Sequence, residues 1–110
     1  MVIEIHTHAN HIGGDVIAEA ESSLFRFHTL LPTLSRCTVH FSQEPEGQMD
    51  KPFECRIEAD IFGNAFSITR NAASYGKALH STLKSMERKV QEIVVRDRQP
   101  PDEALSTVET

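Results

Sequence analysis

The chain has 110 residues, of which 39% are apolar and 25% are charged, so its length and composition predict a single globular domain. The formal net charge of −5 at first argues against nucleic acid as a partner, because phosphate contact depends on clustered cations. No apolar run approaches the roughly 20 residues of a membrane helix, and the N-terminal residues lack the layout of a signal peptide, so we expect a cytoplasmic protein that binds no membrane.

The first 41 residues are predicted to form a strand, a helix and a second strand. Residues 2–6 alternate between apolar and polar side chains, which is typical of a half-buried strand. From Asp15, a plausible N-cap, apolar residues recur at helical spacing until Pro32 ends the pattern. Residues 36–41 alternate again and indicate a second strand.

A hairpin is predicted to follow. Residues 53–61 alternate over nine positions, with their apolar side chains on one face. Gly63 and Asn64 suit a two-residue turn, and this turn would place Ile61 opposite Phe66 in the next strand.

The last predicted element is a helix from about Ser74 to Arg96, because apolar residues recur along one of its faces. This inward stripe comprises Tyr75, Leu79, Thr82, Leu83, Met86, Val90 and Ile93. Residues 97–110 contain a proline pair, several acidic residues and little apolar content. We therefore expect a domain over residues 1–96 and a flexible acidic tail over residues 97–110.

The predicted element order is β-α-β-β-β-α, and every strand has one apolar face. Both helices should therefore cover the same side of one four-stranded mixed sheet, which leaves the other side in solvent. A right-handed first crossover makes the first two strands parallel, and an antiparallel meander follows. The predicted fold class is thus an α/β (α+β) open-faced sandwich.

Motifs for enzymatic chemistry are lacking. The sequence contains no nucleophile elbow, phosphate-binding loop or helical zinc motif, so we expect neither an enzyme, a cofactor nor a small-molecule substrate. Cys37 and Cys55 fall on apolar strand faces, where we expect reduced, buried thiols of low reactivity.

Histidines are numerous for this length. His6, His8 and His11 lie close together in the sequence, but their spacing matches no strong zinc pattern, and we expect no metal. His6 and His40 could lie side by side on the exposed sheet face and form a proton-sensitive patch.

Charge is distributed unevenly along the chain. Residues 1–69 contain four basic and ten acidic side chains, whereas residues 70–96 contain six basic and two acidic ones. On the predicted last helix, Lys77, Lys84 and Arg88 fall opposite the apolar stripe, with Lys89 and Arg96 on a flank. Such a row is either the solvated side of an amphipathic helix or a phosphate-binding surface.

Several segments resemble those of one protein family. The residues LFRF at 24–27 end the first predicted helix, Val39 to Phe41 form a V-x-F strand, YGKALH begins at Tyr75, and KSMERKV spans residues 84–90. With the element order, they make residues 1–96 resemble the single-domain ribosome hibernation promoting factor and ribosome-associated inhibitor (sigma-factor modulation) family. Tyr75, Ala78 and Arg88 coincide with family positions, while Leu79, Met86 and Val90 are conservative equivalents.

The resemblance implies a translation inhibitor that binds the small ribosomal subunit near its decoding region and keeps ribosomes idle in starved or stationary-phase cells. It implies that Arg26 and Arg88 face ribosomal RNA. The complete set of expected RNA-binding residues is Arg26, Arg70, Lys77, Lys84, Arg88 and Lys89, on a protein expected to be a monomer. The chain departs from the family at Ser23 and Ser85, where the family often has lysine.

Two alternatives remain open. The first is a protein-interaction module of the same fold that has lost ribosome binding. Phe25 favours it, because this side chain points away from the apolar stripe of its helix and could mark a partner surface. The second is a metal- or proton-responsive domain that uses His6, His8, His11 and His40.

Overall fold

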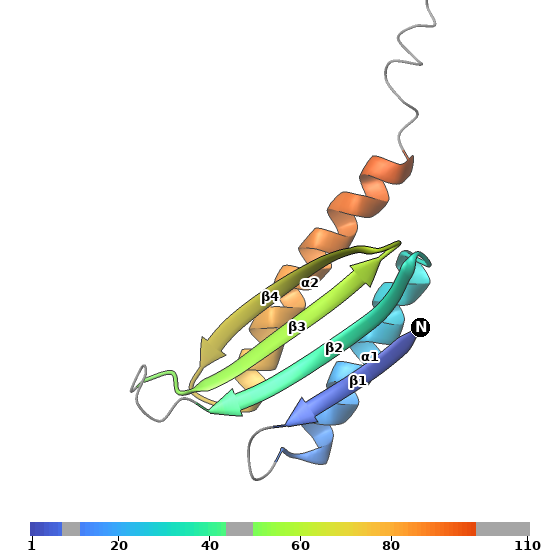
Figure 1. Cartoon of the computed structure of the whole chain (residues 1–110). Coiled ribbons are helices and arrows are strands. Elements are labelled where there is room, and N and C mark those ends of the chain that lie inside the picture. The colour runs from blue at the N-terminus through green and yellow to red at the C-terminus, as the bar shows by residue number, and fades with distance from the viewer. Residues whose placement is uncertain (8–11, 44–49, 99–110) are drawn as a thin grey trace, which may run out of the picture.

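The computed structural model describes residues 1–7, 12–43 and 50–98, and it confirms the predicted element order. The elements are β1 (Val2–Thr7), α1 (Gly14–Leu30), β2 (Leu34–Gln43), β3 (Phe53–Ile61), β4 (Asn64–Ala72) and α2 (Tyr75–Arg98) (Figure 1). The sheet order is β1-β2-β3-β4, in which β1 and β2 are parallel and the other neighbours are antiparallel. The predicted four-stranded mixed sheet is therefore confirmed.

Both helices lie on the same face of the sheet, as predicted (Figure 1). α1 buries Ala20, Leu24 and Phe27, which recur every three or four residues and so share one side of the helix. The buried residues of α2 are Ala78, Leu79, Thr82, Leu83, Met86 and Val90. They pack against the alternating apolar residues of β2 and β3, and together these side chains form one core.

Thr82 is a polar side chain in the centre of this core. Its hydroxyl donates a hydrogen bond to the Ala78 carbonyl oxygen at 2.7 Å and also lies 3.3 Å from the Cys55 carbonyl oxygen. A buried hydroxyl without a partner would cost free energy, so these contacts explain why a threonine is tolerated between α2 and β3.

The start of α1 differs from the prediction. The N-cap residue is Gly13 instead of Asp15, and no side chain caps the helix. The Gly13 carbonyl oxygen accepts hydrogen bonds from the backbone N–H groups of Val16 and Ile17 at 3.1 and 3.2 Å. Asp15 instead lies in the first turn, where a carboxylate interacts favourably with the positive end of the helix dipole.

The predicted register of the β3–β4 hairpin is wrong by two residues. Phe62 and Gly63 form the turn, and both have positive φ angles, 54° and 83°, as a type I′ turn requires. Ile61 therefore pairs with Asn64 instead of Phe66. Because side chains alternate with a period of two, a two-residue shift keeps the same faces together, and hydrophobic alternation alone could not detect it.

α2 begins as predicted and ends later. Ser74 caps it, since its hydroxyl oxygen accepts a hydrogen bond from the Lys77 backbone N–H at 3.1 Å. The helix continues to Arg98, two residues beyond the predicted end. Residues 99–110 lie outside the described residues, so the flexible tail stays a prediction. Neither helix in the described ranges combines the length and apolar composition needed to cross a membrane.

Both cysteines are buried and unpaired, as predicted. Burial disfavours the charged thiolate, and it raises the pKa of Cys37 to about 12 and that of Cys55 to about 11. Since the thiolate is the reactive form, both thiols should be inert in the folded protein.

We expect no thiol to react with Ellman's reagent in the folded protein at about pH 8, and both to react after unfolding. The folded-state pKa values of both thiols exceed the ordinary thiol pKa of 9.0. The two buried thiols therefore add to the free energy of unfolding below pH 9.0, and this contribution is lost as the pH rises toward 11 and 12. Thermal unfolding of a Cys37→Ala variant should therefore depend less on pH above about 9 than that of the parent chain. A rapidly reacting thiol in the folded protein would contradict this assignment.

Candidate nucleic-acid interface

The side of α2 that faces away from the sheet carries the predicted row of cations. Lys77, Lys84 and Arg88 are exposed, and each residue turns an α-helix by about 100°, so spacings of seven and four keep them on one side. Leu79 and Met86 lie on the opposite side and are fully buried. The structure thus places the three cations where the sequence predicted them.

Two further cations lie where α2 meets β4. The Arg70 guanidinium on β4 donates a hydrogen bond to the Ser85 hydroxyl oxygen of α2 at 3.0 Å. The Lys89 ammonium lies 5.8 Å from the centre of the Phe66 ring, which is a cation–π distance. These contacts hold Arg70 and Lys89 along one edge of the row and extend the positive surface onto the sheet.

Ser85 is one of the two positions at which the chain differs from the family that its sequence resembles. The family often has lysine at this position, and the shorter serine leaves room for Arg70 to reach α2. Positive charge therefore comes to this place from a strand instead of from the helix. Sequence reasoning could not detect this pairing, because the two residues are 15 positions apart and belong to different elements.

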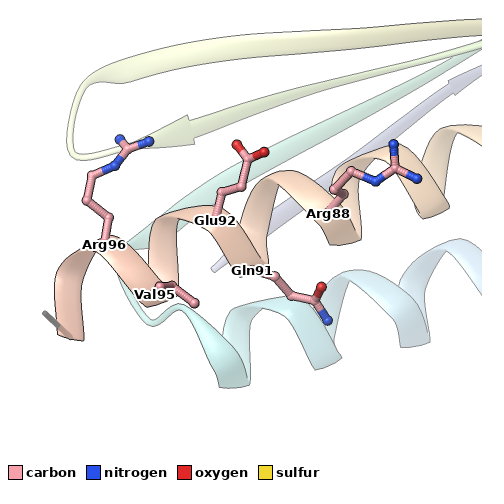
Figure 2. Close-up of a pocket in the computed structure, with 5 residues that line it drawn as sticks. All are labelled: Arg88, Gln91, Glu92, Val95 and Arg96. Atoms are coloured by element: carbon pink, nitrogen blue, oxygen red, sulfur yellow. The ribbon is translucent and has the colours of Figure 1, made fainter.

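The surface around these cations is open. A depression of about 520 Å³ is lined by Arg88, Gln91, Glu92, Val95 and Arg96. Figure 2 shows Arg88, Glu92 and Arg96 extending toward the hairpin side of α2, while Gln91 extends the other way. Because one helix supplies all the lining residues, this is a surface hollow, and it differs from the concave pockets that enclose small ligands.

Among the described residues, six cations of α2 and β4 form no close ion pair with a carboxylate. In the part of the chain that the structure describes, no carboxylate forms an ion pair with Arg70, Lys77, Lys84, Arg88, Lys89 or Arg96. On the outer face of the sheet, by contrast, Arg36 lies 3.9 Å from Glu4 and Arg56 lies 3.5 Å from Glu58. Positive charge outside close ion pairs is therefore concentrated on the α2 and β4 side, where Glu92 lines the same hollow as Arg88 and Arg96.

Arg26 differs from the other predicted site residues. It is exposed on α1, but its guanidinium lies 3.6 Å from the Glu87 carboxylate of α2 and 5.0 Å from the centre of the Phe27 ring. The structure thus brings Arg26 beside the row while partly neutralising its charge. Phe25 is 55% exposed and lies about 100° around α1 from Arg26, so it does not belong to the same surface.

The outer face of the sheet holds the predicted histidine pair. His6 and His40 are register partners, and their rings stack with centres 5.2 Å apart and an angle of 15°. A Glu4 oxygen lies 3.6 Å from His6, and a Glu58 oxygen lies 3.4 Å from His40. Among the described residues, no group of three or more histidine, cysteine or acidic side chains could hold a metal ion. His8 and His11 lie outside the described residues, and a proton-sensitive role stays a prediction.

Solved structures share this arrangement of elements. A ribosomal subunit interface protein from Coxiella burnetii has a TM-score of 0.69 and 13% identity, and the match covers 84% of this chain and 97% of that chain. The N-terminal domain of Protein Y from Thermus thermophilus has a TM-score of 0.67 and 17% identity, and the match covers 84% and 99%. This chain has their fold. No protein-family model and no curated protein matches the sequence.

The predicted resemblance to hibernation factors is therefore confirmed at the level of the fold. On this fold, six described cations of α2 and of the neighbouring strand β4 lie outside any close ion pair.

Lys84 and Arg88 are exposed, so reversing their charges should change the free energy of unfolding only slightly. In a Lys84→Glu/Arg88→Glu variant, the new carboxylates would lie near Glu87 and Glu92, so we expect the free energy of unfolding to fall by less than about 1 kcal/mol. Urea denaturation followed by circular dichroism measures this change. A larger loss would mean that the two cations support the fold.

Proposed function

We propose that this chain is a ribosome-associated translation inhibitor of the hibernation type, which binds ribosomal RNA of the small subunit near the decoding region. The observation that carries the proposal is the uncompensated row of Lys77, Lys84 and Arg88, flanked by Arg70 and Lys89. The fold supports it, because the chain shares that fold with a protein described as a ribosomal subunit interface protein.

Electrostatics explains how an acidic chain would bind RNA. Phosphates attract the cations of α2 and β4 and repel the outer sheet face with Glu4, Glu54 and Glu58, so the domain approaches RNA with α2 foremost. An open surface suits recognition of RNA by shape and phosphate contact. Such binding blocks the decoding region by occupying it, and the proposal therefore includes no enzymatic step and no cofactor.

Charge reversal on the row tests the proposal. We expect the Lys84→Glu/Arg88→Glu variant to bind purified small subunits roughly tenfold or more weakly than the parent chain in cosedimentation, because two phosphate contacts become repulsive. The slope of log affinity against log salt concentration is negative, and its magnitude should decrease by roughly two. Chemical footprinting with the parent chain should show protection of small-subunit RNA at the decoding region.

An Arg36→Glu/Lys51→Glu variant is the matched control. It changes the net charge by the same amount, but Arg36 lies on the outer sheet face and Lys51 just before β3, so binding should be retained. Unchanged binding of the Lys84→Glu/Arg88→Glu variant would overturn the proposal. A pull-down dominated by one non-ribosomal protein, whose capture is lost in Phe25→Ala, would instead favour the protein-interaction alternative.

Glu87 provides a test in the opposite direction. Its carboxylate partly neutralises Arg26, and both side chains are more than a third exposed, so the pair contributes little to stability. Glu87→Gln should free Arg26 and remove one negative charge beside the row, which should strengthen subunit binding roughly two- to fivefold at low salt. Glu54→Gln, which removes the same charge from the outer sheet face, should leave affinity unchanged. Equal affinities of the two variants would exclude Arg26 from the interface.

A further inference from the structure

The turn between β3 and β4 presents an aromatic side chain in an unfavourable place. Phe62 is 78% exposed, more than any other large apolar residue described, and its φ angle is 54°. Positive φ is uncommon outside glycine, and for a bulky residue it is an outlier. Asparagine or aspartate before glycine is the usual choice in a type I′ turn. Phe62 is therefore unfavourable both for the backbone of the turn and because its apolar ring is exposed to water. Residues with strained backbone angles of this kind concentrate at functional positions.

The turn that carries Phe62 is well anchored. The Asp60 carboxylate accepts a hydrogen bond from the Gly63 backbone N–H at 2.9 Å, and the Ser35 hydroxyl donates one to the Asp60 carbonyl oxygen at 3.1 Å. Ile61 and Asn64 pair directly across the base of the turn. The ring is therefore presented from a fixed position, which lowers the entropy cost of binding.

Two cations lie on one side of this turn. A cleft of about 350 Å³ beside the turn is lined by Ile61 and Asn64 from the hairpin and by Lys89 and Arg96 from α2. Figure 2 shows the Arg96 guanidinium extending toward the hairpin. Lys89 is also one of the cations that flank the α2 row. The turn that carries the exposed ring therefore adjoins one end of the positive surface.

We propose that Phe62 is a stacking platform for one unpaired RNA base, with Arg96 and Lys89 contacting the neighbouring phosphates. The proposal rests on the proposed function and adds a second kind of contact to it. Every base has a flat π face that an aromatic ring can stack on, and the adjacent cations favour a phosphate-bearing partner over an apolar protein pocket.

Substitutions at Phe62 separate the role of the ring in binding from its role in folding. Phe62→Asn should raise or maintain the thermal midpoint, because Asn-Gly favours a type I′ turn, yet it should weaken small-subunit binding roughly tenfold. Phe62→Tyr should retain affinity, and Phe62→Leu should lose it, because leucine is apolar but cannot stack. Phe25→Ala, at the exposed phenylalanine of α1, is the control and should bind like the parent chain.

Salt dependence gives an independent measurement. Phe62→Asn should lower affinity at every salt concentration without changing the salt slope, whereas Arg96→Gln should reduce the slope by roughly one. Unchanged affinity of Phe62→Asn, or full affinity of Phe62→Leu with loss in Phe62→Tyr, would overturn base stacking; the second result would indicate an apolar protein pocket. If Lys84→Glu/Arg88→Glu still loses binding in that case, the proposed function stands and only the role of Phe62 fails.

Discussion

The removal of one sheet face from water is the interaction on which the rest of this structure depends. Phe27 of α1, Phe41 of β2 and Met86 of α2 are fully buried in the layer between sheet and helices. Charged side chains cannot enter that layer without a large desolvation cost. They must therefore lie either on the outer face of the sheet or on the outer sides of the helices, and the fold acquires two exposed surfaces that face in opposite directions.

These two surfaces differ in how their charges are compensated. On the outer sheet face, arginines and histidines lie beside carboxylates of the same strand or of a neighbouring strand. On α2, the cations that face solvent have no carboxylate partner among the described residues. The net charge of −5 is thus a poor guide to how this molecule meets a polyanion, because the cations of α2 and β4 lie on the opposite side of the core from the carboxylates of the outer sheet face.

Periodicity predicted most of the fold, because one-sided burial imposes a period of two on strands and 3.6 on helices. It predicted the buried stripe of α2 and the exposed row with Lys84 for the same reason. It could not predict features that depend on backbone conformation or on distant pairs. The N-cap at Gly13 uses only a carbonyl oxygen, and the contact between Arg70 and Ser85 joins two elements through tertiary packing.

The position of the hairpin turn also determines where Arg70 lies, although Arg70 is near the far end of β4. Two registers of β4 would bury the same apolar faces, so the core does not distinguish strongly between them. Gly63, whose φ is 83°, fits the turn of either register, but the observed turn at Phe62 and Gly63 is anchored by the hydrogen bond that the Gly63 backbone N–H donates to the Asp60 carboxylate. A two-residue slip would carry Arg70 roughly 7 Å along β4 and away from Ser85. The placement of a two-residue turn at one end of the sheet thus controls whether a strand arginine and a helix serine meet.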